Sequence, residues 1–381
     1  MVQAQRRQQV PLSQPAITEA DIAAVTDVLR TPTLSIGPKL TAFERAAAEY
    51  VGMRHGIGVN SGTSGLHVAL AAAGVGEGDE VITSPFSFVA SANCAIYQGA
   101  TPVFADIEEA TLGLDPEKVE AAITDRTRAI VPVDVFGQPC RIEEISAIAR
   151  RHGLAVIEDS CEAIGAERNG VRVGAPQFVD AAVFAFYPNK QMTTGEGGMV
   201  VTNDDTMAAT MRSMVNQGRD DAGTWMNHVR LGYNYRLDEM SAALGLSQIG
   251  RIDEILAARE RVAAMYTERL AGVDGVRVPT IVPETTRMSW FVYVIQLEDG
   301  IDRTALIDAL QADGVPTRPY FVPIHVQPFY RERFGYAPGD FPVTERVAAH
   351  TLAIPFFTNM TESQVDYVSD RMRSAIGAAG Q

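Results

Sequence analysis

The chain contains very few lysines. Of its 32 basic residues only Lys39, Lys118 and Lys190 are lysines, and the rest are arginines. Arginine stays protonated and has no free amine, so it cannot form a covalent imine with a carbonyl group. Chemistry that requires a reactive side-chain amine must therefore use one of these three residues.

Cysteines and long apolar runs are also scarce. The 3 cysteines, Cys94, Cys140 and Cys161, are widely spaced and form no CxxC pair. This excludes a disulfide scaffold and gives no support for a structural zinc site, so we expect no metal. No run approaches the roughly 18 apolar residues that a membrane span needs, and the start MVQAQRRQQV lacks the apolar segment of a secretion signal. We expect a cytoplasmic protein with no membrane partner.

The charge balance is strongly acidic, with 47 acidic against 32 basic residues and a net charge of −15. Nucleic acids and anionic membranes require basic surface, so we expect neither as a partner. A phosphorylated small molecule needs only a local cluster of donors and is not excluded. The length of 381 residues is sufficient for a large domain and a smaller one.

Short apolar runs alternate with segments of helical periodicity through the first half of the chain. The apolar runs are at 55–60, 80–83, 102–106, 129–135, 155–159, 181–186 and 199–202, and the helical segments are at 64–73, 87–98, 116–123 and 142–152. Strands that are apolar throughout and separated by helices are typical of a mostly parallel sheet covered on both faces. We therefore predict an α/β fold with a mostly parallel seven-stranded sheet between helices.

The pattern changes after residue 204. A helix at 206–216 and a polar loop at 218–235 are followed by a long amphipathic segment at 237–271, with a possible break at Gly250. The remainder has an α+β pattern, with strands predicted at 290–297 and 315–319 and helices at 303–313, 342–350 and 361–375. We expect a large domain over residues 16–250, a smaller C-terminal α+β domain over 251–381 and an N-terminal arm over 1–15.

Ligands of such sheets bind beyond the carboxyl ends of the strands. At that edge, Asn-Ser-Gly-Thr-Ser-Gly (60–65) precedes a predicted helix, where free N–H groups and hydroxyls can hold an anion. An ordinary helix cap with flanking turn glycines explains the same residues. Asp159 ends a buried strand and could cap a helix, bind a metal or a sugar hydroxyl, or pair with a protonated ring nitrogen.

Lys190 lies in the loop after the run at 181–186 and is followed by a glycine-rich turn at 193–198. Alone, it is explained equally well as a solvated loop residue. Lys118 lies on a predicted exposed helix and Lys39 precedes the sheet, so only Lys190 is expected at the ligand edge. An amine, an anion site, a strand-end acid and the aromatic Phe88 together are the parts that a pyridoxal phosphate (PLP) site requires.

The sequence resembles the DegT/StrS group of nucleotide-sugar aminotransferases, which are PLP enzymes of the aspartate aminotransferase fold (fold type I). The resemblance extends from about residue 36 to 368. The stretches that carry it include V-N-S-G-T-S-G-L (59–66), I-E-D-S (157–160), K-Q-M-T-T-G-E-G-G (190–198), G-Y-N-Y-R-L-D-E (232–239) and P-I-H-V-Q (323–327).

The resemblance implies a role for each matching position. Lys190 corresponds to the lysine that forms the Schiff base, and Asp159 to the partner of the pyridine nitrogen. Around the cofactor, the resemblance places Phe88 on its ring, Gly62, Thr63 and Ser64 at its phosphate, and Glu162 beside it.

Further positions concern a second subunit and the substrate. Asn234 matches an asparagine that reaches the phosphate from the neighbouring subunit, which implies a homodimer with shared sites. The substrate positions implied in the same way are Tyr187, Arg318, Tyr320 and His325.

The sequence departs from the family pattern at three positions. Ala185 stands where a phosphate-binding Ser is usual, Glu162 replaces Gln or His, and Asp134 stands where His is frequent. A carboxylate at Glu162 would be repelled by the phenolate-like oxygen of the cofactor unless it is protonated or paired, so we expect its pKa to be raised.

The implied activity is transfer of an amino group from an amino acid, with L-glutamate expected, to a keto sugar nucleotide. The product would be an amino (deoxy) sugar for polysaccharide, O-antigen or antibiotic biosynthesis. One alternative is a same-family aminotransferase that acts on a non-nucleotide ketone, such as a cyclitol or an aminobenzoate precursor. The others are a non-catalytic regulatory homologue and a dehydratase, which Lys190 disfavours because the family's dehydratases have His there.

Overall fold

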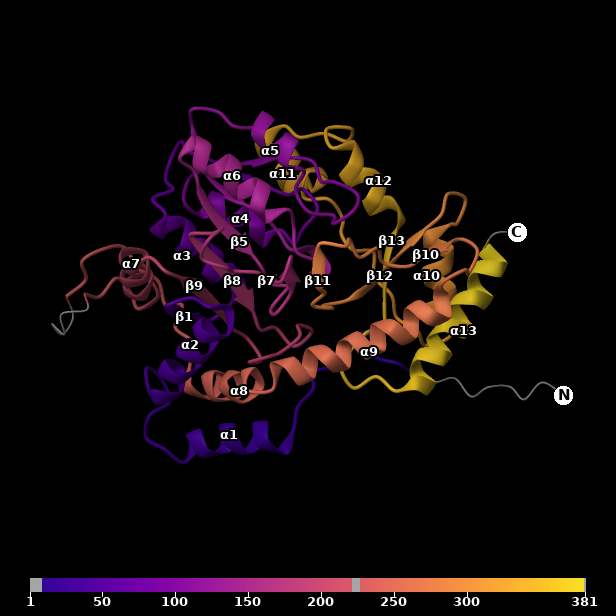
Figure 1. Cartoon of the computed structure of the whole chain (residues 1–381), viewed down its shortest axis with the longest axis horizontal. Coiled ribbons are helices and arrows are strands. Elements are labelled where there is room, and N and C mark those ends of the chain that lie inside the picture. The colour runs from indigo at the N-terminus through magenta and orange to yellow at the C-terminus, as the bar shows by residue number, and fades with distance from the viewer. Residues whose placement is uncertain (1–8, 221–226, 380–381) are drawn as a thin grey trace.

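The computed structural model describes residues 9–220 and 227–379, and its centre is a seven-stranded sheet in the order β1-β9-β8-β5-β4-β2-β3 (Figure 1). The strands are β1 (His55–Val59), β2 (Glu80–Thr83), β3 (Thr101–Phe104), β4 (Thr127–Val131), β5 (Ala155–Asp159), β8 (Ala181–Ala185) and β9 (Gly198–Thr202). Each matches one of the predicted apolar runs. Only β9 is antiparallel to its neighbours, β1 and β8, so the prediction of a mostly parallel sheet is confirmed.

Helices cover both faces of this sheet. Side chains alternate between the two faces along each strand. In β2, Ile82 therefore packs into the hydrophobic core on one face and Val81 into the core on the other. The first face carries α2 (Pro38–Val51), α5 (Pro116–Ala121), α6 (Ile142–His152) and α8 (Glu239–Ile249), and the second carries α3 (Gly62–Ala72), α4 (Ala90–Tyr97) and α7 (Asp205–Val215). Because both faces are covered, the strands are apolar over nearly their whole length.

A helix pair connects the two halves of the chain. α8 ends at Ile249 and α9 (Ile252–Leu270) begins just beyond, so the predicted break at Gly250 is confirmed. α9 contributes Ile252 to the core of the large sheet and Tyr266 to a second, C-terminal core, and it crosses between the two regions in Figure 1. The domain boundary between residues 250 and 251 stays a prediction.

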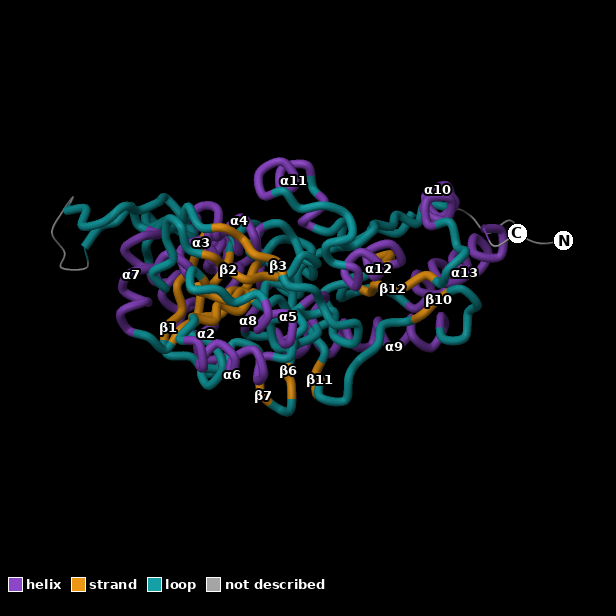
Figure 2. Tube along the Cα trace, turned by 90° about the horizontal axis from the view of Figure 1, so that it is seen from above, coloured by secondary structure: helices purple, strands orange, loops and turns teal. Residues whose placement is uncertain are grey.

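The C-terminal region is built on a three-stranded antiparallel sheet in the order β10-β12-β13. Its elements are β10 (Val276–Arg277), β12 (Tyr293–Leu297), α10 (Arg303–Ala312), α11 (Pro328–Phe334), α12 (Pro342–His350), β13 (Thr351–Ile354) and α13 (Glu362–Ala379). Seen from above, α11 stands out from the rest of the chain (Figure 2). A separate small sheet joins β11 (Thr285–Arg287) to β6 (Glu167–Arg168) and β7 (Val171–Arg172), and so ties this region to the large one.

The predicted strand at 315–319 is wrong. Arg318 makes only an isolated bridge to Ala353. Pro316 and Pro319 have no N–H to donate, so the segment cannot continue a ladder of hydrogen bonds.

The described part of the predicted N-terminal arm lies along the C-terminal region. The N–H of Val10 donates to the carbonyl of Gly314, and the carbonyl of Leu12 accepts from the N–H of Phe356. Residues 1–8 of the arm lie outside the described residues. Within the described part of the chain, no helix has both the length and the apolar character that a membrane crossing requires.

Candidate active site

A cavity of about 490 Å³ lies at the carboxyl ends of β5 and β8, where the sequence predicts the ligand edge. Loops from the large sheet supply most of its walls, among them Ser61–Thr63, Ser87, Asp159 and Lys190. The C-terminal region closes it with Phe291, Tyr320 and Phe321. The site therefore forms between two parts of the chain that are distant in sequence.

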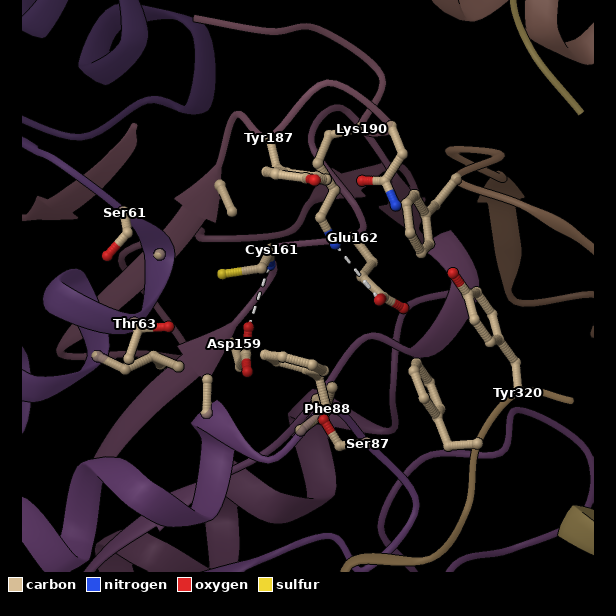
Figure 3. A pocket seen from close by; sticks show the side chains of 18 of the residues that line it. Ser61, Thr63, Ser87, Phe88, Asp159, Cys161, Glu162, Tyr187, Lys190 and Tyr320 are labelled. Atoms are coloured by element: carbon tan, nitrogen blue, oxygen red, sulfur yellow. Dashed lines mark hydrogen bonds and ion pairs between the residues drawn. The ribbon is translucent and has the colours of Figure 1, made fainter. Parts of the chain in front are cut away.

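Lys190 places its amine inside this cavity. Its backbone N–H donates to the carbonyl of Tyr187 at 2.9 Å, which fixes the loop after β8. Its Nζ lies 3.4 Å from Oε1 of Glu162 (Figure 3). The ring centre of Phe291 lies 4.0 Å from the same atom. The other two lysines lie on α2 and α5, so Lys190 is the only lysine that lines the cavity among the described residues.

Asp159 is the last residue of β5, and its carboxylate is buried at the cavity wall. Oδ2 accepts from the hydroxyl of Ser91 at 2.7 Å, and Oδ1 accepts from the N–H of Cys161 at 3.2 Å. A carboxylate held at both oxygens has a fixed orientation. It can therefore keep a protonated ring nitrogen paired in the cavity.

Glu162 follows on the same loop and is also buried. Its Oε2 accepts from the N–H of Phe136 at 3.0 Å, while Oε1 faces Lys190. Burial raises the pKa of Glu162, Lys190 opposes that rise, and Asp159 adds to it. The expected upward shift of this pKa is therefore present.

The start of α3 forms a cradle for an anion. Ser61 caps the helix by accepting from the N–H of Ser64 at 3.1 Å, and Ser61, Gly62 and Thr63 line the cavity. A Cβ at Gly62 would lie 2.8 Å from both Cβ of Ala185 and Sγ of Cys161, so glycine is required for this close approach. The first N–H groups of a helix have no partner within the helix and bind phosphate well. The cradle therefore fits the phosphate of PLP.

One predicted member of the cradle has a different position. The hydroxyl of Ser64 donates to Oδ1 of Asn60 at 2.6 Å, and Ser64 is buried behind the loop rather than at the cavity wall. Ser61 and Thr63 are the hydroxyl residues that line the cavity from this loop. The role of Ser64 at the phosphate stays a prediction.

Aromatic side chains surround the rest of the cavity. Phe88 and Tyr187 line it and are 62% and 51% exposed in the single chain. Tyr320 and Phe321 stack on each other, with ring centres 5.0 Å apart. Burial raises the pKa of Tyr320, and the carboxyl of Glu162 raises it further.

Besides Ser64, three predicted site residues do not line the cavity of the single chain: Asn234, Arg318 and His325. Asn234 and Arg318 are exposed. His325 is fully buried, with Nε2 2.9 Å from Oε1 of Glu345 and its ring against Phe341. Their roles toward a partner subunit or a substrate stay predictions.

Sequence reasoning did not identify Ser91 or Phe291. Ser91 looks like an ordinary polar residue in the first turn of α4, and Phe291 looks like part of the C-terminal core. No motif marks either of them. Only the packing of α4 and of the C-terminal region brings them to Asp159 and Lys190.

A lysine amine and a fixed carboxylate beside a phosphate cradle define a site for a phosphorylated aldehyde cofactor that transfers amino groups. This is the class of enzyme that the fold and the site favour together. The chain belongs to the DegT/DnrJ/EryC1/StrS aminotransferase family, whose model matches residues 15–373.

Individual relatives match over most of the chain. It is 42% identical to GDP-perosamine synthase of Caulobacter vibrioides over 336 residues, which are 88% of this chain and 89% of that protein. It is 39% identical to the spore coat polysaccharide biosynthesis protein SpsC of Bacillus subtilis, with both chains covered completely. The solved PLP-form of Spr1654 from Streptococcus pneumoniae superposes with a TM-score of 0.91 at 25% identity, over 98% of this chain and 100% of that one.

Proposed function

We propose that this aminotransferase moves an amino group from an amino acid, with L-glutamate as the expected donor, to a keto sugar linked to a nucleoside diphosphate. The product is an amino sugar. Pyridoxal phosphate is the cofactor, as in the PLP-form of Spr1654. The observation that carries the proposal is that Nζ of Lys190 and the carboxylate of Asp159 open on one cavity beside the start of α3.

The residues of the cavity would hold the cofactor at three points. Gly62 and Thr63 would bind its phosphate, Asp159 would pair with its ring nitrogen, and Phe88 would offer a flat apolar surface for its ring. Bound pyridoxal phosphate supplies an aldehyde that Lys190 can hold covalently and a ring that accepts electrons from the carbon next to the amino group.

Lys190 has a second task once the donor has displaced it from the cofactor. Its neutral amine takes a proton from the α-carbon of the donor and returns it on the cofactor side, which is general base and then general acid catalysis. Asp159 keeps the ring nitrogen protonated throughout, because a buried carboxylate beside that nitrogen favours its charged form. The same groups act in reverse on the keto sugar.

The choice of substrate rests on the relatives. One is named as a GDP-perosamine synthase, which points to a nucleotide-linked amino sugar, and another as a spore coat polysaccharide biosynthesis protein, which points to polysaccharide biosynthesis. We further propose a cytoplasmic homodimer with shared sites. Asn234 is exposed and outside the cavity of its own chain, as a residue that serves the partner's site would be.

The test is spectroscopic. Protein purified with pyridoxal phosphate should have a visible absorption band that shifts when L-glutamate is added. Lys190→Ala should lose both the band and the shift, whereas Lys118→Ala, at an exposed residue of α5, should keep them. The proposal would be contradicted by a protein that has no visible absorption band, or by a band that does not shift with any amino acid tried.

The acceptor is tested by product formation from a panel of nucleotide-linked 3-keto and 4-keto 6-deoxy sugars. Competitive inhibition by a nucleoside diphosphate is expected if the nucleotide is part of the substrate. Turnover of a cyclitol or aminobenzoate precursor without such inhibition would favour the non-nucleotide alternative.

A further inference from the structure

Two groups contact Nζ of Lys190, and neither has a role so far in the proton transfer. Oε1 of Glu162 lies 3.4 Å away and the ring centre of Phe291 lies 4.0 Å away. A carboxylate and the face of an aromatic ring both attract a positive charge and give nothing comparable to a neutral amine. The surroundings of Nζ are therefore suited to an ammonium group.

The carboxyl of Glu162 is held so that one oxygen remains for Lys190. Oε2 accepts from the N–H of Phe136 at 3.0 Å, and the backbone carbonyl of Glu162 accepts from the side-chain amide of Gln191. The side chains of Lys190 and Glu162 are only 13% and 10% exposed. Screening by water is weak at such exposure, so the interaction is stronger than a surface ion pair.

Phe291 is held by the same residue that holds Glu162. Its N–H donates to the carbonyl of Phe136 at 3.3 Å, and its own carbonyl accepts from Nη2 of buried Arg259 at 2.7 Å. Phe136 therefore uses its N–H for Glu162 and its carbonyl for Phe291. Its backbone has φ 58°, a left-handed conformation that is uncommon for a residue other than glycine. One turn of backbone thus fixes both contacts to Nζ.

We propose that Glu162 and Phe291 are positioning residues that stabilise the ammonium form of Lys190 when the lysine takes a proton from the donor's α-carbon. This inference rests on the proposed function. In the step, the C–H bond breaks, its electron pair stays with the substrate and cofactor, and an N–H bond forms at Nζ. Nothing is oxidised or reduced, and the new positive charge appears between a carboxylate and a ring face that are already in place.

Other ionisable groups also face this pair. Asp159 ends β5 just before the loop of Glu162, Tyr320 approaches from the C-terminal region, and Glu196 lines the cavity (Figure 3 labels Asp159 and Tyr320). The carboxyl of Glu162 is nonetheless the group within ion-pair distance of Nζ. Its replacement should therefore have the largest effect on the charge of Lys190.

The first test needs no aminotransferase activity. The full chain without cofactor is treated with an amine-acylating reagent across a range of pH, and acylation of each lysine is followed by mass spectrometry. In Glu162→Gln, Lys190 should reach half-maximal acylation at a lower pH than in the unmodified chain, because its ammonium form has lost the ion-pair partner at 3.4 Å. Lys39 and Lys118 are references in the same molecules and should not move.

Three further variants sharpen this measurement. Glu162→Asp keeps the charge and should recover part of the shift. Phe291→Leu should shift Lys190 in the same direction by a smaller amount. Glu143→Gln, which removes a partly buried carboxyl paired with Arg168 away from the cavity, should leave Lys190 unchanged.

The second test measures proton transfer in the holoenzyme through loss of deuterium from α-deuterated L-glutamate. Glu162→Gln should slow this exchange by on the order of a hundredfold, with KM changed little and a larger primary isotope effect. Phe291→Leu should slow it by about threefold to tenfold. A purely structural role would lower the amount of folded enzyme without changing the isotope effect.

The two tests separate the possible failures. If the acylation midpoint of Lys190 is the same in Glu162→Gln and Phe291→Leu as in the unmodified chain, the inference is overturned even though glutamate exchanges its deuterium. If the midpoint shifts but no amino acid exchanges its α-hydrogen, the proposed function fails. The stabilisation of the Lys190 ammonium by Glu162 is then supported without it.

Discussion

The hydroxyl of Ser91 on α4 lies 2.7 Å from Oδ2 of Asp159 at the end of β5. A hydrogen bond to a charged group typically contributes about 1.5–3 kcal/mol. The bond from Ser91 therefore both stabilises the buried carboxylate of Asp159 and fixes the direction in which it faces the cavity. This contact links the helix layer to the site.

Ser91→Ala should therefore weaken the site without abolishing it. We expect a fall in kcat/KM of about tenfold or more, smaller than that of Asp159→Ala, because Oδ1 keeps its bond from Cys161. Ser146→Ala, at a buried serine on α6 outside the cavity, is the matched control. Equal losses in both variants would show that the effect comes from packing alone.

Ala185 gives a prediction of improved binding. It lines the cavity next to Gly62, and the resemblance to the family predicts a phosphate-binding serine at this position. Ala185→Ser should add a hydrogen bond to the cofactor phosphate and lower the dissociation constant of pyridoxal phosphate by about tenfold, since bonds to charged groups have that magnitude. Titration of the apoenzyme by absorbance measures it. A weaker cofactor complex would mean that the hydroxyl finds no room beside Gly62.

The large sheet and its ligand edge could be predicted because buried parallel strands leave a strong signal. β5 and β8 are apolar runs that end in Asp159 and just before the Lys190 loop, so the topology rule alone brings these two residues together. The scarcity of lysine then singled out Lys190. The small sheet of β11, β6 and β7 had no such signal, because strands of two or three residues show no periodicity.

The finer composition of the site depends on packing that a sequence pattern does not express. Ser61, Thr63 and Ser64 are equivalent as hydroxyl residues in the motif, and only the helix cap decides that Ser64 turns back to Asn60. Phe291 reaches Lys190 because Arg259 and Phe136 hold its backbone. The family resemblance predicts His325 as a substrate-binding residue. Its burial against Phe341 depends on how the C-terminal region folds, which the motif does not express.

Arg259 should be a strong determinant of stability. This fully buried guanidinium donates to the carbonyls of Trp290 and Phe291 and to the hydroxyl of Thr358 at 3.0 Å, and burial lowers its pKa to about 9. Arg259→Met leaves three acceptors unpaired, so we expect a loss of about 3–5 kcal/mol in the free energy of unfolding by denaturant.

The control for this variant lies on the same helix. Arg261→Met removes an exposed arginine from α9 and should change the stability by no more than about 0.5 kcal/mol. Similar losses in the two variants would show that the buried hydrogen bonds of Arg259 contribute little. In a folded Arg259→Met protein, the pH for half-maximal acylation of Lys190 should also change, because the backbone of Phe291 loses one of its two hydrogen-bond partners.

Asp134 gives a prediction about pH. It is fully buried, with Oδ1 accepting from the N–H of Cys140 at 2.9 Å and Oδ2 accepting from the hydroxyl of Ser160 at 2.7 Å. Burial raises its pKa to about 6 from an ordinary value of 3.8, and the neighbouring Asp159 adds to the rise. Its side chain also lies close to those of Cys140 and Glu158, and burial raises the pKa of Glu158 as well.

The sign of the pH effect follows from proton binding. Between pH 4 and pH 6 the folded chain keeps the proton of Asp134 while the unfolded chain has lost it, so the stability falls as the pH rises through this window. Above pH 6 the folded chain bears the full penalty of a buried carboxylate. At about 1.4 kcal/mol per pKa unit, the shift corresponds to a penalty of about 3 kcal/mol at most.

Asp134→Asn removes this penalty and keeps the geometry, because an amide can accept from Cys140 and donate to the hydroxyl oxygen of Ser160. Relative to the unmodified protein, the variant should be more stable at pH 8 by about 1–3 kcal/mol, and the difference should shrink toward pH 4. Urea unfolding at pH 4.5, 6 and 8 measures the difference, with exposed Asp125→Asn as the control for net charge. A difference that is the same at every pH would show that Asp134 does not titrate in this range, and that its carboxyl is kept for its two hydrogen bonds alone.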